Sequence, residues 1–124
     1  MTEVIRRIGV TNLDTGPWVA GGAARSVFLG EELRLSGDID IFTRTFESQH
    51  AALVAVVEKA VKVNDRKKNS HGTESLYASF EAVHGGFVDL KWQIIGPKYY
   101  SKDLPDLFKI FDFTVCQFAT DGHT

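Results

Sequence analysis

The stretch Ser36-Gly-Asp-Ile-Asp-Ile-Phe-Thr43 alternates polar and apolar side chains over most of its length. This alternation predicts a β-strand over residues 38–43. In a strand, Asp38 and Asp40 project from one face, about 6.5–7 Å apart along the chain. Ile39 and Ile41 point to the opposite face, which we expect to be the core. The chain is therefore expected to contain a sheet that buries one face and carries carboxylates on the other.

The two carboxylates of this strand suggest a cation site. Like charges side by side are unfavourable unless a cation lies between them. Hard oxygen ligands suit Mg²⁺ (or Mn²⁺), which takes one or two protein carboxylates and completes its coordination with phosphate oxygens and water. The alternative is two solvated aspartates at a strand end, which is the more common meaning of an isolated Asp-x-Asp pair.

The segments around residues 38–43 predict a mixed arrangement of helices and strands. We expect an α/β (α+β) fold, a small mixed sheet flanked by helices. We expect it to form a single domain over residues 1–124, whose C-terminus could be truncated. The predicted helices cover about residues 3–9, 23–29, 47–63 and 102–109; the strands cover 18–20 and the two sides of His84-Gly85-Gly86; the loops cover 12–17 and 64–72; and 111–119 fits a strand or the start of a helix.

Two of these elements have a clear apolar side. The predicted helix over 47–63 has a single apolar stripe, made of Leu53, Val57, Ala60 and Val61. The strand after the glycines alternates: one side is apolar, and the other carries Phe87, Asp89, Lys91 and Gln93, while the apolar side consists of Val88, Leu90, Trp92 and Ile94.

Composition and charge limit the function classes. The chain has 124 residues, of which 44% are hydrophobic and 24% charged, as in ordinary globular proteins. It has no apolar run of about 18 residues, so we expect no membrane span, and its single cysteine fits a reducing cytoplasm. A net charge of −2 argues against tight nucleic-acid binding by these residues alone. A molecule on which this chain acts is therefore expected to be small, or to be held by another domain or a partner subunit.

Three further features suggest that this cation site also binds the phosphates of a nucleotide. Gly21-Gly22 ends one predicted strand and opens a helix, so its backbone can approach an anion; a plain turn is the alternative. Arg25 lies one helical turn later and could add a cation, or be a surface arginine. Asp89 could supply a third carboxylate for a two-metal site, or be an exposed residue paired with Lys91.

Other candidate residues have simpler interpretations. The basic segment Lys62, Arg66, Lys67 and Lys68 is expected to be a solvated loop, with steering of a polyanionic acceptor as the alternative. Cys116 lies in an apolar run and is expected to be a buried, inert thiol. The histidines show no metal-ligand spacing; they are His50, His71, His84 and His123.

Two segments, read together, resemble the DNA polymerase beta-like nucleotidyltransferase superfamily. They are Trp18-Val-Ala-Gly-Gly-Ala-Ala-Arg25-Ser-Val-Phe-Leu-Gly30 and Ser36-Gly-Asp-Ile-Asp-Ile41. The resemblance is closest to the head domain of tRNA CCA-adding enzymes and bacterial poly(A) polymerases. The segment Asp112-Phe-Thr114-Val-Cys-Gln-Phe-Ala119 is similar to that family's Arg-Asp-Phe-Thr segment. Departures occur at Ser26, where the family has an aspartate, and at Ile110, Phe111 and Cys116.

The resemblance implies a role for each matched residue. It implies a nucleotide site that includes the glycine pair, Arg25 and Ser36, with Asp112 and Thr114 on the ribose side. It implies that Asp38, Asp40 and Asp89 are catalytic and hold the metal ions. The implied reaction transfers a nucleoside monophosphate from an NTP to a hydroxyl of RNA, tRNA, a protein or a small molecule. The resemblance also implies that the chain binds ATP.

The sequence leaves three alternatives to this enzyme open. The chain could be an inactive nucleotide- or protein-binding module of the same fold. It could be a minimal transferase that modifies a protein, an antibiotic or a small RNA, as in toxin–antitoxin systems. It could also be a structural α/β module whose Asp-x-Asp pair binds nothing.

Overall fold

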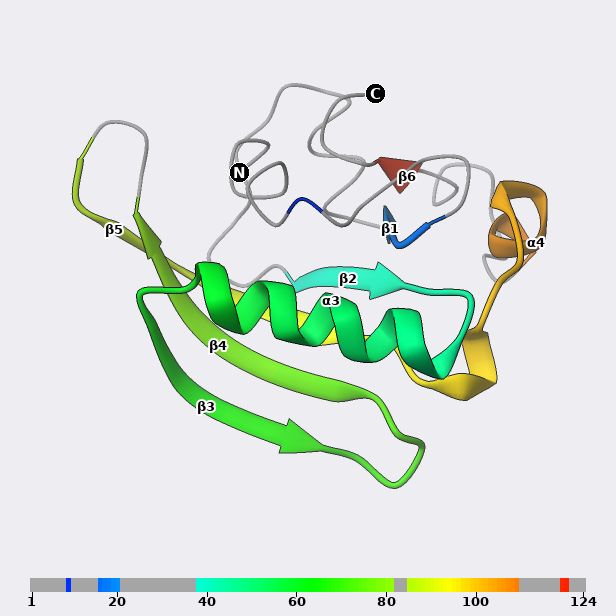
Figure 1. Ribbon diagram of the computed structural model, residues 1–124, viewed down its shortest axis with the longest axis horizontal. Coiled ribbons are helices and arrows are strands. Elements are labelled where there is room, and N and C mark those ends of the chain that lie inside the picture. Colours follow the sequence, from blue (N-terminus) through cyan, green and yellow to red (C-terminus); the bar gives the residue numbers. More distant parts are fainter. Residues whose placement is uncertain (1–8, 10–15, 21–37, 82–84, 110–118, 121–124) are drawn as a thin grey trace.

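A computed structural model describes residues 9, 16–20, 38–81, 85–109 and 119–120 (Figure 1). The predicted helices over 3–9 and 23–29 and most of the segment 111–119 lie outside these ranges. The described helices and strands are β1 (Trp18–Ala20), β2 (Asp38–Phe42), α3 (Phe46–Lys59), β3 (Lys62–Lys68), β4 (Glu74–Glu81), β5 (Phe87–Ile94), the 3-10 helix η1 (Pro97–Tyr99), α4 (Leu104–Phe108) and β6 (Ala119–Thr120).

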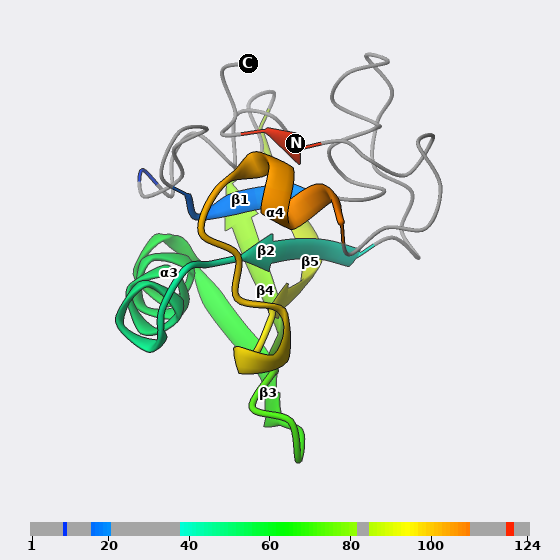
Figure 2. The ribbon, with the colours of Figure 1, turned by 90° about the vertical axis from the view of Figure 1, so that its right-hand side faces the viewer.

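Within the described ranges, one mixed sheet has the strand order β3-β4-β5-β2-β1-β6. Its only parallel pair is β2 with β5, whereas the other neighbouring described strands are antiparallel. Figure 2 shows α3 along one face of the sheet and α4 beside β1 at the opposite end from β3. This mixed α+β arrangement confirms the predicted fold class, and the strands at 18–20 and 38–42 and around Gly85-Gly86 were predicted correctly.

The face of the sheet that α3 covers holds the main hydrophobic core. Ile39 and Ile41 of β2 are fully buried there, as the alternation of the strand predicts. On β5, Leu90, Trp92 and Ile94 are buried in the same cluster. Asp40, Asp89, Lys91 and Gln93 alternate with these buried residues and therefore lie on the opposite face, and the backbone of Asp38 takes the register position beside Lys91.

A second apolar cluster covers part of that opposite face at the β1 end. It consists of Trp18, Ala20, Phe42 and Leu107, and all four side chains are buried. Leu107 comes from α4, which begins at the N-cap Asp103, whose side chain accepts a hydrogen bond from the Asp106 backbone N–H. The carboxylate face is thus closed by an apolar cluster on one side of β2 and remains polar on the other.

Helix α3 ends earlier than the sequence predicts. It begins with a capping box between Thr45 and Ser48 and ends at Lys59, whereas the predicted helix continues to residue 63. Val61 donates its backbone N–H to the Ser79 carbonyl and is 56% exposed, so its place in the predicted apolar stripe is wrong. The helix instead buries Ala52, Leu53, Ala55 and Val56, together with Gln49.

The segment predicted as a loop over 64–72 is largely the edge strand β3. Its side chains are mostly exposed and charged, with no apolar alternation, so the sequence pattern gives no strand signal. Its backbone is held instead by antiparallel pairing with β4, with a register shift between Val63 and Asp65. Charged residues are common on edge strands because they discourage pairing with other chains.

Gln49 fastens α3 to the loops at one end of the sheet. Its amide nitrogen donates to the Gly72 carbonyl at 2.8 Å, and its amide oxygen accepts from the Tyr100 hydroxyl at 2.5 Å. Burial raises the pKa of the Tyr100 phenol, because it disfavours the phenolate.

This raised pKa predicts a loss of stability in base. The folded chain holds the phenolic proton more tightly than the unfolded chain, so the stabilisation is complete below the unfolded pKa of about 10. It is lost as the pH rises through the folded value. We expect the melting temperature to fall more steeply above about pH 10 for the unmodified chain than for Tyr100→Phe. Tyr99→Phe, at a 40% exposed tyrosine, is the control; equal slopes for all three proteins would contradict the prediction.

Candidate functional site

The polar face of the sheet brings Asp38 and Asp40 beside β5. The parallel register pairs Asp38 with Lys91 and Asp40 with Gln93. On its other side, Asp40 pairs with Ala20 of β1, and its own side chain is half-buried. Two residues of one strand on one face are about 6.5–7 Å apart along the chain. A lysine and an amide thus lie directly beside the two carboxylate positions.

Asp89 lies on the same face but farther along β5. It precedes Lys91 by two residues, so its Cα is about 8 Å from that of Asp38 and about 14 Å from that of Asp40, given ordinary strand spacings. Its carboxylate accepts a hydrogen bond from the Ser79 hydroxyl, and Asn64 donates to the same hydroxyl oxygen at 3.3 Å. Asp89 can therefore share a ligand with Asp38 more readily than with Asp40.

Among the described residues, no group of three or more His, Cys, Asp or Glu side chains is gathered closely enough to hold a metal ion. The described helices include none that is long and apolar enough to cross a membrane. The remaining predicted nucleotide-binding residues lie outside the described ranges: Gly21, Gly22, Arg25, Ser36, Asp112 and Thr114. Their roles, and the metal-binding role of Asp38, Asp40 and Asp89, stay predictions.

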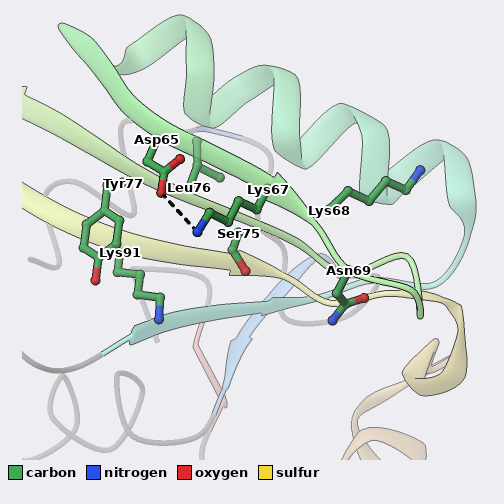
Figure 3. A pocket seen from close by; sticks show the side chains of 8 residues that line it. All are labelled: Asp65, Lys67, Lys68, Asn69, Ser75, Leu76, Tyr77 and Lys91. Atoms are coloured by element: carbon green, nitrogen blue, oxygen red, sulfur yellow. Dashed lines mark ion pairs between the residues drawn. The ribbon is translucent and has the colours of Figure 1, made fainter.

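A hollow of about 360 Å³ opens on the same face, over β3, β4 and β5 (Figure 3). The Tyr77 ring is 45% exposed, and the ammonium of Lys91 lies 5.8 Å from its centroid. Lys67 contributes a second cation, whose nitrogen is 3.9 Å from an Asp65 carboxylate oxygen. The lining residues are Asp65, Lys67, Lys68, Asn69, Ser75, Leu76, Tyr77 and Lys91.

The hollow was not predicted from the sequence. Part of its lining could have been predicted from the sequence of β4. There, Ser75, Tyr77 and Ser79 alternate with the buried Leu76 and Ala78. That alternation assigns Tyr77 to the polar face. The contribution of β3 could not be seen, because the segment with Lys67 was interpreted as a loop.

The comparison with protein families covers nearly the whole chain. A family model described as the Gabija anti-defense 2 family protein matches residues 2–124. The chain belongs to this family. No curated protein and no solved structure matches the chain.

This result corrects the resemblance inferred from the sequence. The assignment to the DNA polymerase beta-like nucleotidyltransferase superfamily is wrong, because the family that matches residues 2–124 is a different one. The resemblance depended on a glycine pair, an Asp-x-Asp strand and a short tail segment. A glycine pair also forms ordinary turns, and Asp-x-Asp occurs in any strand with one solvated face. The chemistry of the carboxylates has to be argued from their own positions.

Proposed function

We propose that this chain counteracts Gabija defence by transferring a nucleoside monophosphate from an NTP to a hydroxyl acceptor. Membership of the Gabija anti-defense 2 family supports the biological role. The observation that carries the chemistry is the register of β2 and β5, which sets Asp38 and Asp40 on one face beside Lys91 and Gln93. The acceptor belongs to one of three classes: RNA, a protein or a small molecule.

The donor set fits a hard divalent cation such as Mg²⁺ or Mn²⁺. Asp38 and Asp40 offer carboxylate oxygens from one face of a strand, and such oxygens are the protein ligands that Mg²⁺ prefers. Asp89 offers another carboxylate, and its Cα is expected about 8 Å from that of Asp38 from the register and ordinary strand spacings. When bound, the cation would neutralise phosphate charge and lower the pKa of an acceptor hydroxyl.

In the proposed reaction, the hydroxyl of the acceptor attacks the α-phosphate of the NTP. The acceptor oxygen forms a bond to the α-phosphorus, the bond between that phosphorus and the bridging oxygen breaks, and pyrophosphate leaves. A carboxylate of the face, or water, takes the hydroxyl proton. Asp38 and Asp40 would hold the cation to which the triphosphate binds, and Lys91 beside Asp38 would offset negative charge on the triphosphate.

The direct test uses the purified chain with each α-³²P-labelled NTP and an extract of cells that carry Gabija defence. We expect label to move onto an acceptor, with pyrophosphate released in equal amount, and both to stop in EDTA. The same chain should weaken the defence when it is expressed in those cells. Weakened defence without any pyrophosphate release would overturn the transfer mechanism.

A second candidate function is nucleotide or protein binding without transfer. It is favoured by Asp89, whose carboxylate accepts a hydrogen bond from Ser79 and whose Cα is about 14 Å from that of Asp40 at ordinary strand spacings. Calorimetric titration with each NTP and Mg²⁺ separates the two candidates when it is paired with the pyrophosphate assay. Saturable binding with no turnover favours the second.

A further inference from the structure

The hollow of Figure 3 combines a half-exposed tyrosine with three lysines, Lys67, Lys68 and Lys91, on a chain of net negative charge. The whole chain has a net charge of −2. In the hollow, Lys91 lies beside the Tyr77 ring, and Lys67 points toward Asp65, the acidic residue of the lining. The contact of Lys67 with Asp65 is long, 3.9 Å, and both side chains are more than half exposed. Such surface pairs contribute little, about 0–1 kcal/mol, so an anion can compete for the lysine.

Tyr77 is held in place by strand pairing on both sides. It lies opposite Asp65 of β3 and Lys91 of β5, so its backbone is fixed at the middle of three paired strands. Its ring stands out from the polar face, and Ser75 lies two residues away on the same side. An exposed aromatic ring on a sheet, flanked by cations, suits stacking of an unpaired base, with the cations on the neighbouring phosphates.

The hollow continues directly into the carboxylate positions. One row across the strands on this face runs Asp65, Tyr77, Lys91 and Asp38, and the next runs Lys67, Ser75, Gln93 and Asp40. Tyr77 is two strands from Asp38, which places their Cα atoms about 10 Å apart at the usual strand spacing. A chain-like anion seated on Tyr77 can therefore extend along the row to the carboxylates.

We infer that this hollow binds a single-stranded polynucleotide, with one base stacked on Tyr77 and its phosphates near Lys67 and Lys91. As a corollary, which rests on the proposed function, the strand presents its hydroxyl at Asp38 and Asp40 as the acceptor. The binding is modest and salt-sensitive, because few cations contribute to it. Single-strand binding weakens with salt by about 0.7 logarithmic units per phosphate contact and tenfold change in salt, so two lysines give a slope of about −1.4.

The test measures binding of fluorescein-labelled oligouridylate and oligothymidylate of about ten nucleotides, within the usual site size of such surfaces. Fluorescence anisotropy is followed at low salt in EDTA and without NTP, so that transfer does not contribute. The variant is Tyr77→Thr with Lys91→Gln; threonine removes the ring but, like tyrosine, is favoured in strands, so β4 should be kept. The matched control is Tyr99→Thr with Lys98→Gln, since Lys98 lies 5.4 Å over the Tyr99 ring outside the hollow.

We expect the Tyr77/Lys91 variant to bind at least about fivefold more weakly, from the loss of stacking alone, and the Tyr99/Lys98 control to bind like the unmodified chain. The single variant Tyr77→Phe should bind like the unmodified chain, because it keeps the aromatic ring. The two oligonucleotides show whether the 2′-hydroxyl contributes. Equal binding by variant and control, with circular dichroism showing both folded, would overturn the inference. Equally tight binding of polyglutamate to the unmodified chain would overturn it too.

This experiment separates the binding site from the proposed chemistry. Asp38→Asn with Asp40→Asn should bind the oligonucleotides at least as well as the unmodified chain, because two repelling charges are removed. If the unmodified chain binds the oligonucleotides but transfers no nucleotide to them, the site is established and its acceptor role is rejected. Lost binding in Tyr77→Thr alongside normal transfer to a small acceptor would support the site and leave the transfer chemistry standing.

Discussion

Replacing both Asp38 and Asp40 by asparagine is expected to lower nucleotide incorporation by about a thousandfold or more. A metal-held phosphoryl group gains several kcal/mol of charge stabilisation, and each 1.4 kcal/mol corresponds to a factor of ten in rate. Asparagine keeps the size of the side chain but removes its charge. Label transfer from α-³²P NTP, compared at equal protein concentration, gives the measurement.

The same double variant should fold normally. Asp38 and Asp40 are on the face opposite the α3 core, and removing two like charges from one face relieves repulsion. The matched control is Glu47→Gln with Glu58→Gln, which makes the same charge change at exposed positions of α3. Incorporation should be unchanged in that control. Transfer that survives in the Asp38/Asp40 variant, or that falls equally in the control, would show that the two aspartates do not carry the reaction.

The sequence correctly predicts the strands in which one face is buried, because burial of one face makes apolar and polar residues alternate along the strand. In β2, Ile39 and Ile41 are buried and the aspartates alternate with them. In β5, Leu90, Trp92 and Ile94 are buried and alternate with more exposed residues. Each strand has one face against the core, and this one-sided burial is what a period of two records.

The errors occur where pairing rather than burial decides the structure. Strand β3 is exposed along nearly its whole length and is held by its backbone bonds to β4, which no local pattern reveals. The C-terminal end of α3 was misplaced for a related reason. Ala60 and Val61 extend the apolar spacing of the helix, but the helix ends at Lys59, and the Val61 backbone N–H donates to the Ser79 carbonyl.

The candidate site was predictable only in part for the same reason. The spacing of Asp38 and Asp40 shows from the sequence that they share a face. Their neighbours Lys91 and Gln93 depend on the register of a parallel pair, in which β2 and β5 are far apart in the sequence. The row from Tyr77 to Asp38 requires both that register and the hairpin register of β4 with β5. A short motif resemblance cannot supply these registers, and here it led to the wrong family.

A second large effect is expected from adding one methyl group at Gly96. Its backbone has φ −79° and ψ −175°, a conformation that alanine adopts without strain. A Cβ at this position would lie 2.5 Å from the His71 carbonyl oxygen and 2.8 Å from the Gly72 carbonyl carbon and the Thr73 nitrogen. These are backbone atoms, so no side chain can rotate away. Glycine is therefore required at position 96 because the backbone of residues 71–73 comes so close to it, and not because of its φ angle.

The loop that Gly96 touches cannot move without losing several hydrogen bonds. Asn69 accepts from the backbone N–H groups of His71 and Thr73 through its side chain, and the Gly72 carbonyl accepts from Gln49 of α3. Gly96 itself donates its N–H to the Thr73 hydroxyl at 2.9 Å. A shift that clears the clash would break bonds on both sides of the contact. We expect Gly96→Ala to cost about 3 kcal/mol, the upper part of the usual range for overpacking.

The measurement is the thermal midpoint, and the expected decrease is about 10 °C for a domain of this size. Gly86→Ala is the matched control, because a Cβ there meets nothing within 4 Å while its φ of +73° costs a left-handed penalty. That penalty is about 1 kcal/mol, so the control should lose much less. Because Asn69 lines the hollow, Gly96→Ala should also weaken oligonucleotide binding below its melting temperature. A stability for Gly96→Ala equal to that of Gly86→Ala would show that the backbone of residues 71–73 does not pack against Gly96 as described.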